Sequence, residues 1–79
     1  MTIKLLAFSR CAEAVGASIV SWELAEVTTV ESLLVSLKAK YPKLSGMNLV
    51  IAVNQEVAVQ SKIVQAGDEV ALLPPVSGG

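Results

Sequence analysis

Histidine is missing from this 79-residue chain, and cysteine occurs only once, as Cys11. Without histidine the chain lacks the commonest general base and the commonest metal ligand. A single cysteine cannot form an internal disulfide, and one cysteine without histidine argues against a zinc site. We therefore expect no metal site and no catalysis that depends on a histidine of this chain.

Long apolar runs and clustered positive charge are also missing. The longest apolar stretches fall far short of the roughly 20 residues that span a bilayer, and the N-terminus leads directly into a strand pattern instead of a signal peptide. The net charge is −1, and the six basic residues are scattered, without the basic and aromatic interleaving typical of nucleic-acid binding. We expect a cytoplasmic protein that binds neither a membrane nor nucleic acid.

Aliphatic residues are what the chain has in excess. Hydrophobic residues make up 53% of the sequence, whereas aromatic residues contribute 4%. A domain of this size buries only about 60–65% of the surface that its unfolded chain exposes, so its core is modest. Either the aliphatic residues pack a tight core, or part of the apolar surface stays exposed until a partner covers it. We favour the second interpretation.

Hydrophobic periodicity predicts two strands, then a helix. Residues 3–8 and 18–24 have strand patterns, and a short helical segment, 9–15, lies between them and ends at Gly16. The clearest element is a helix over 29–41, because its apolar residues recur with a 3.6-residue period. These residues are Val30, Leu33, Leu34, Leu37 and Tyr41.

Both ends of this helix carry matching signals. Thr28 with Glu31 forms a candidate capping box, and Thr29 is the alternative N-cap. Pro42 follows the last apolar residue and stops the helix, because the residue before a proline avoids helical backbone angles.

The second half of the chain has strand patterns separated by turns. The strands are expected at 49–53, 57–59 and 69–73, with turns at 54–56 and 66–68. Ile63 is the expected buried anchor between the last two strands. One long helix that follows an opening hairpin and packs on one face of a mixed sheet is the β-grasp, or ubiquitin-like, arrangement of the α+β class. We expect a single β-grasp domain over 1–73.

The last six residues are unlike the rest, and they read Pro74, Pro75, Val76, Ser77, Gly78 and Gly79. The prolines favour a stiff, extended exit from the sheet, and six extended residues reach about 20 Å. The two glycines lack side chains, so their backbone can pass through a narrow channel and approach another active site. A frayed end or a leftover linker is the alternative. We expect a tail, 74–79, that is presented to a second protein.

Strand parity predicts exposed apolar side chains. Lys4 and Phe8 share one face of the first strand, and Glu69 and Leu73 share one face of the last. Because the charged side chains should point to solvent, Phe8 and Leu73 are expected to be exposed with them. Trp22, by contrast, alternates with apolar residues and is expected to pack against the core.

Other polar or reactive side chains have ordinary structural interpretations. Cys11 has no histidine or second cysteine to activate it, so a small buried residue is expected here, not a sulfur carrier. Arg10, Glu13 and Asp68 are expected to form surface ion pairs, which are usually worth less than about 1 kcal/mol.

Several segments together carry a resemblance. They are 8–10 with Glu13 and Gly16, 29–31, 52–56, 67–71 and the ending 74–79. With these segments, the chain resembles the small subunit of molybdopterin synthase, a family of ubiquitin-like sulfur carriers, over nearly its whole length. One departure is Ala12, where many members have a basic residue that can face the large subunit.

The resemblance implies a function for the tail. A partner activating enzyme would adenylate the Gly79 carboxylate with ATP, and a sulfurtransferase would convert the acyl adenylate to a thiocarboxylate. The tail would then enter the active site of the large subunit, in a heterotetramer, and give sulfur to cyclic pyranopterin monophosphate. Two such transfers make the dithiolene of molybdopterin. The chain would not catalyse alone and would hold no tightly bound cofactor.

The resemblance also implies roles for other residues. Gly78 and the segment 74–77 would present the tail, while Phe8, Val57 and Leu73 would contact the large subunit. Alternatives are a sulfur carrier for thiamine or another metabolite, a ubiquitin-like protein modifier joined through Gly79 to lysines, and a plain binding module. Thiamine-type carriers usually lack Pro-Pro-Val and the insert at 10–16.

Overall fold

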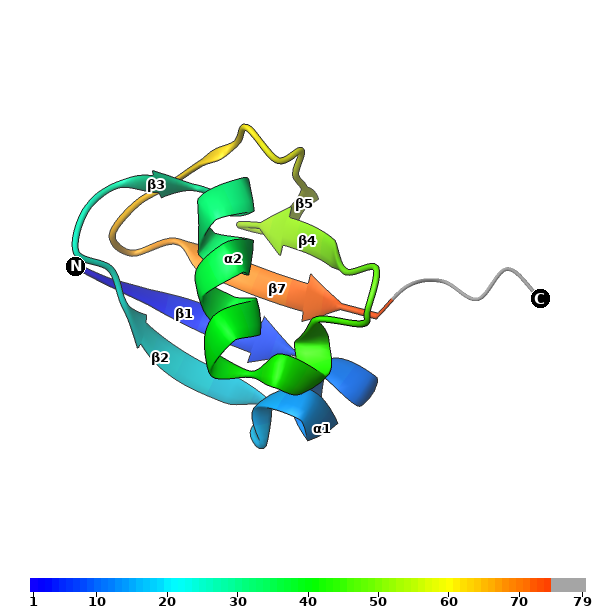
Figure 1. Ribbon diagram of the computed structural model, residues 1–79. Helices are drawn as coiled ribbons and strands as arrows, with labels where there is room; N and C mark the ends of the chain where they lie inside the picture. The colour runs from blue at the N-terminus through cyan, green and yellow to red at the C-terminus, as the bar shows by residue number, and fades with distance from the viewer. Residues whose placement is uncertain (75–79) are drawn as a thin grey trace.

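The computed structural model describes residues 1–74, which form a mixed β-sheet with a long helix across one face (Figure 1). The elements are β1 (Thr2–Ala7), α1 (Arg10–Val15), β2 (Ile19–Glu23), β3 (Thr28–Thr29), α2 (Val30–Lys40), the 3₁₀ turn η1 (Pro42–Leu44), β4 (Val50–Val53), β5 (Glu56–Val57), β6 (Ile63–Val64) and β7 (Glu69–Leu73). The sheet order is β2-β1-β7-β4-β5, and β3 and β6 form a separate pair. The predicted β-grasp fold is confirmed.

The core lies between the sheet and α2. Along β1 the alternation is regular: Ile3, Leu5 and Ala7 are buried, whereas Lys4 is exposed. The helix contributes the predicted apolar stripe, of which Val30, Leu33 and Leu37 are buried and Leu34 and Tyr41 are half-buried. No helix within residues 1–74 has the length and apolar character needed to cross a membrane.

The N-terminus of α2 is capped by Thr29, so the capping box predicted from Thr28 and Glu31 is wrong and the alternative cap is confirmed. The Thr29 hydroxyl accepts a hydrogen bond from the backbone N–H of Ser32 at 3.2 Å. Thr28 and Thr29 are both extended in β3, so the helix begins at Val30 and Thr29, not Thr28, is the residue directly before it. Two further N–H groups of the first turn donate to backbone carbonyls of residues 60 and 62, at 3.0 and 2.9 Å.

The segment before β7 differs from the prediction. Ile63, the expected buried anchor, is 50% exposed, and its neighbour Val64 is fully buried instead. The pairing of β3 with β6 decides this, because it turns Val64 towards the core and Ile63 away from it. The strand expected at 57–59 is also shorter and earlier, ending at Val57. The remaining boundaries agree within two residues.

A network of side chains fixes the start of β7. Asn54 lies in the β4–β5 turn with a positive φ of 51°; its Oδ1 accepts from the Glu69 N–H at 3.0 Å and its Nδ2 donates to Asp68 Oδ1 at 3.1 Å. The second carboxylate oxygen of Asp68 accepts from the Gln65 N–H at 2.9 Å. Asp68 therefore makes hydrogen bonds and not the expected ion pair.

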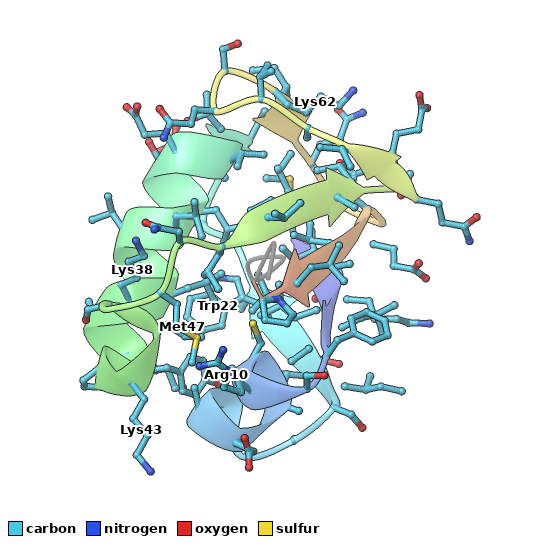
Figure 2. The ribbon with its side chains drawn as sticks, turned by 90° about the vertical axis from the view of Figure 1, so that its right-hand side faces the viewer. Arg10, Trp22, Lys38, Lys43, Met47 and Lys62 are labelled. Carbon is cyan, nitrogen blue, oxygen red and sulfur yellow. The ribbon has the colours of Figure 1, made fainter. Side chains whose placement is uncertain are left out.

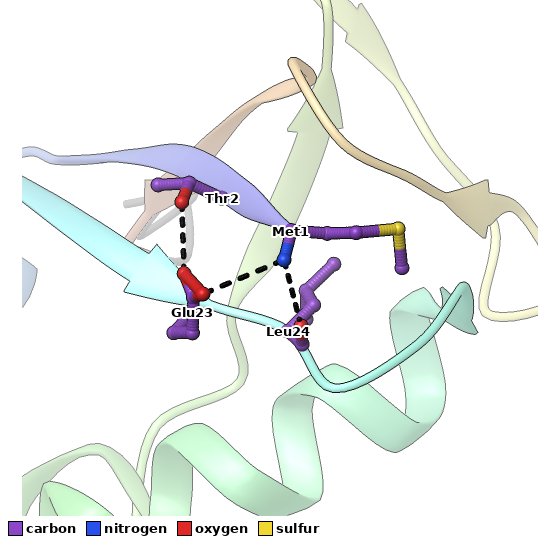
Figure 3. Close-up of polar contacts among 4 residues, drawn as sticks. All are labelled: Met1, Thr2, Glu23 and Leu24. Carbon is purple, nitrogen blue, oxygen red and sulfur yellow. Dashed lines mark hydrogen bonds and ion pairs between the residues drawn. The ribbon is translucent and has the colours of Figure 1, made fainter.

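The ion pair found within residues 1–74 lies at the N-terminus (Figure 3). The Met1 amine donates to Glu23 Oε1 at 3.4 Å and to the Leu24 carbonyl at 3.2 Å, and the Thr2 hydroxyl donates to Glu23 Oε2 at 2.8 Å. These contacts fasten the start of β1 to the end of β2. The ion pairs expected for Arg10 and Glu13 do not form among the described residues.

The Glu23 contacts predict a pH dependence. The Thr2 hydroxyl, followed by the Met1 amine, lowers the pKa of Glu23 below its ordinary value of 4.5. A lowered pKa in the folded state means that the contribution of Glu23 to stability is present above 4.5 and is lost as the pH falls through the lowered value. Thr2→Val should raise the pKa of Glu23 towards 4.5 in an NMR titration of its carboxyl carbon. An unchanged pKa of Glu23 would mean that the Thr2 hydroxyl is not the main cause of the lowered pKa.

The packing of α2 predicts the cost of a cavity. Leu37 is fully buried, so Leu37→Ala should lower the free energy of unfolding by about 2–5 kcal/mol in a denaturant titration. Val35, on the same helix, is 67% exposed, and Val35→Ala should change it by less than about 0.5 kcal/mol. A loss below about 1 kcal/mol for Leu37→Ala would contradict the assignment of the buried face.

Candidate functional site

The candidate site begins where β7 ends. β7 lies in the middle of the sheet, parallel to β1 and antiparallel to β4. Its last residues are held on both sides: the Phe8 N–H donates to the Leu72 carbonyl at 3.1 Å, and Leu73 pairs with Val50. Pro74 follows directly and is half-buried. Because proline has no N–H to donate, the pairing of β7 stops at Leu73.

The other predicted tail residues, Pro75, Val76, Ser77, Gly78 and Gly79, lie outside the described residues. The structure does describe the end of β7, the strand that precedes these residues in the chain. β1 and β7 are parallel and point to the same end of the sheet, where α1 also lies (Figure 1). The tail therefore starts from a strand whose direction and register are fixed by two neighbours.

The sheet face that α2 does not cover has a continuous apolar row. The strand registers place five side chains next to one another across all five strands, in the order Ile19, Leu6, Ala71, Ala52 and Val57. Directly paired residues project to the same face of a sheet, so these side chains form one surface. Val57 is 76% exposed and Ile19 is 63% exposed.

A second group of apolar side chains lies on the same face, closer to the start of the tail. Phe8 follows β1 beside the end of β7, and it is 46% exposed. Leu73 and its partner Val50 are half-buried. The predicted exposure of Phe8 is confirmed, and that of Leu73 is partial because Val50 lies beside it. We call Phe8, Leu73, Leu6, Ile19 and Val57 the open-face patch.

Ile19 was missed in the sequence as a member of this patch, although a signal was present. Val20, Trp22 and Leu24 alternate on the face that points to α2, and Ile19 must therefore project to the opposite face with Ser21. The structure thus adds a residue to the predicted apolar surface and extends it to the outer strand of the sheet.

Positive charge gathers at the end of the molecule to which β7 points. Figure 2 views this end and shows Arg10 of α1, Lys43 of η1 and Lys38 of α2 on the helix side of the sheet. Arg10 and Lys43 are exposed, and Lys38 is half-buried.

Cys11, the one thiol, is a poor candidate for sulfur chemistry. Its side chain is fully buried, and burial raises the pKa of the Cys11 thiol, an effect that the charge of Arg10 opposes more weakly. A thiol with a raised pKa stays protonated near neutral pH and is a weak nucleophile. The expectation of a small buried residue is confirmed. Residues 1–74 contain no group of three or more carboxylate or cysteine side chains placed to hold a metal ion.

Comparison with known proteins shows which family the chain belongs to. The model of the ThiS family matches residues 4–79. The chain is 37% identical to the molybdopterin synthase sulfur carrier subunit of Arabidopsis thaliana, in an alignment of 79 positions that covers 98% of this chain and 82% of that protein. It is 40% identical to the corresponding subunit of Chlamydomonas reinhardtii, in an alignment of 83 positions, gaps included, that covers both chains completely.

Solved structures agree with the fold. SAMP1 from Haloferax volcanii superposes with a TM-score of 0.83 at 30% identity, covering both chains completely. A chain from the complex of subunits 1 and 2 of the molybdopterin-converting factor of Helicobacter pylori has a TM-score of 0.66 at 20% identity, also over both full lengths, and this likeness shows the fold alone. From the family model and the curated relatives together, the chain belongs to the ThiS family and, within it, to the molybdopterin synthase sulfur carrier subunits.

Proposed function

We propose that this chain carries sulfur as a thiocarboxylate on Gly79 and donates it to cyclic pyranopterin monophosphate, which forms the dithiolene of molybdopterin. Family membership and the position of β7 support the proposal most directly. The family match extends through residue 79, and β7 ends six residues before it. In this view the chain consists of a β-grasp domain, 1–73, and a working tail, 74–79.

Loading the tail requires activation by another protein. A free carboxylate is a poor electrophile, because its charge repels nucleophiles and its oxygens leave badly. An activating enzyme that uses ATP would form the Gly79 acyl adenylate and release pyrophosphate. A sulfurtransferase would then supply sulfur to the acyl carbon, and AMP would leave with the electrons of the broken bond. ATP would thus be consumed by the partner, in the cytoplasm, and need not stay bound to this chain.

Delivery of sulfur to the large subunit depends on the length of the tail and on the lack of side chains at Gly78 and Gly79. Six extended residues span about 20 Å, enough for Gly79 to enter a buried active site while the domain stays outside. Pro74 and Pro75 limit the conformations of the first part of the tail. Gly78 lets the backbone pass where a Cβ would collide with the channel wall.

The open-face patch is the proposed contact with the large subunit. Phe8 and Leu73 lie at the end of the strand that leads into the tail, and Val57 lies on the same sheet face two strands away, so a subunit that binds this face would also receive the tail. The structurally similar Helicobacter pylori protein forms a complex with subunit 2 of its converting factor. We propose the equivalent pairing here, with two small and two large subunits.

Removal of the last residue tests the proposal. Deleting Gly79 should abolish dithiolene formation in an assay with the large subunit, the activating enzyme, ATP and a sulfur source. Gly78→Val should reduce loading or transfer strongly, because a β-branched side chain is added at the tip. Both variants should melt like the parent chain, since the change lies beyond β7. Full activity of the deletion variant would disprove the proposal.

The open-face patch predicts that a charged substitution in it weakens binding of the large subunit without lowering the stability of the domain. Because Phe8 is already exposed, Phe8→Asp should leave the melting temperature almost unchanged but weaken binding of the large subunit by more than about 2 kcal/mol. Val35→Asp, at an exposed position on α2, is the matched control and should bind like the parent. Unfolding of Phe8→Asp would place Phe8 in the core. Unchanged affinity would place the interface elsewhere.

The likeness to SAMP1, which belongs to the small archaeal modifier proteins, favours a second candidate: conjugation of Gly79 to lysines of other proteins. Intact mass after incubation with the activating enzyme, ATP and a sulfur source separates the two functions. A gain equal to the exchange of one oxygen for sulfur supports the carrier. Ladders of heavier conjugates in a lysate support the modifier.

A further inference from the structure

A second feature of this fold is not used by the sulfur-transfer proposal: the outer edge of β2. Among residues 1–74, β2 is the outermost strand of the sheet, with β1 on one side and no strand on the other. We infer that this edge, with the groove between β2 and α2, binds an extended segment of a partner protein, which adds to the sheet as a sixth strand. The inference holds whether or not the tail carries sulfur.

The pairing of β1 with β2 shows which backbone groups are free. The Ala7 N–H donates to the Ser18 carbonyl and the Leu24 N–H donates to the Met1 carbonyl, so hydrogen-bonded pairs fall on alternate residues along the ladder. The residues between them, Ile19, Ser21 and Glu23, point their N–H and C=O groups away from β1. They present a ready ladder of donors and acceptors to an added strand.

A groove lies beside this edge, on the face towards α2. It has a volume of about 230 Å³, and its apolar lining includes Trp22 of β2, Leu24 directly after β2, and Leu33 of α2. Ser36 of α2 lines the opposite wall. The volume suits an aliphatic side chain, and an added strand would turn every second side chain into it.

Charges around the groove define the chemistry of the occupant. Lys40 lies over the Trp22 ring, with its Nζ 5.6 Å from the ring centroid, whereas Glu23 and Glu26 line the cavity. α2 runs from the side where β2 ends to the side where β2 begins, so Lys40 lies towards the start of β2 (Figure 1). An antiparallel segment should therefore have a basic residue at its N-terminal end and an acidic residue at its C-terminal end.

A second copy of the chain is a poorer occupant. Pairing two β2 strands about a twofold axis at Ser21 would place the exposed Ile19 of one copy opposite Glu23 of the other. That carboxylate is already bonded to Thr2 and the Met1 amine. An apolar side chain opposite a charged one gains little from the pairing. A partner segment with alternating aliphatic residues avoids this mismatch.

The tail and the β2 edge can be engaged at the same time. β1 separates β2 from β7, and the groove lies on the helix side of the sheet whereas the open-face patch lies on the other. A protein that binds β2 could hold the domain while Gly79 reacts elsewhere, and the local concentration of the tail at that protein would rise.

The test uses the full chain and the synthetic peptide Lys-Thr-Ile-Thr-Val-Thr-Asp, blocked at both ends. In an antiparallel pairing its Ile and Val point into the groove and its charged ends meet Glu26 and Lys40. We expect NMR shift changes at β2 and α2, slower exchange of the Ile19, Ser21 and Glu23 amides, and a Kd below about 1 mM. The peptide with Lys and Asp exchanged should bind several-fold more weakly.

Two variants block the site differently. Ser21→Pro removes an N–H that points away from β1, a position where an edge strand tolerates proline, and should abolish binding. Ser36→Arg should also abolish it by filling the groove, while the control Val35→Arg should bind like the parent. Shift changes confined to Phe8, Leu73 and Val57, binding that survives both variants, or no shift changes at millimolar peptide would overturn the inference. So would self-association through β2 without peptide.

Discussion

The two-sided hydrogen bonding of β7 is the constraint on which the rest of this structure depends. β1 on one side and β4 on the other fix the direction and register of the strand. Register in turn decides that Val70 and Leu72 enter the core and that Ala71 and Leu73 face outwards. It also decides where the pairing stops, and hence where the tail begins. A slip of one residue would exchange the faces and bury the wrong side chains.

The Asn54 and Asp68 contacts explain why two segments distant from the tail matter to it. Asn54 binds the backbone of Glu69 and the side chain of Asp68, at the start of β7. The tail leaves from the opposite end of the same strand. Contacts that fix the start of a short strand also fix its end, because a paired strand moves as one body. The polar contacts at the start of β7 thus help to fix the strand end after which the tail begins.

The burial of the two sheet faces helps to explain the excess of aliphatic residues in the sequence. The interior of residues 1–74 has no buried charged or polar residue, and its core closes on one sheet face, where α2 is joined by Cys11 of α1 and Leu44 of η1. On the other face the ends of the apolar row, Ile19 and Val57, are exposed, Leu6 and Ala71 are half-buried, and Ala52 is buried. Leaving such a surface exposed costs free energy that only a partner can recover. The excess of aliphatic residues thus fits the proposed contact with the large subunit on this face.

Much of this could be predicted from the sequence, because it rests on local patterns. The period of 3.6 residues predicted α2, and alternation placed Phe8 on the exposed face, whereas the assignment of the reacting group to the ending Pro-Pro-Val-Ser-Gly-Gly stays a prediction. Buried Cys11 followed from the lack of any residue to activate it. Each of these signals lies within a few neighbouring residues, so no knowledge of distant contacts is required.

Only the tertiary structure decided the rest. Two-residue strands have no periodicity, so β3 and β6 could not be predicted from the sequence. Their pairing keeps Thr29 extended, which makes it the N-cap of α2, and it turns Val64 inwards in place of Ile63. The free groups of Ile19 and Ser21 depend on which side of β2 faces β1. The groove needs Trp22 and Leu33 side by side, although 11 positions separate them in the sequence. Such contacts join distant residues, and a linear pattern does not record which distant residues meet.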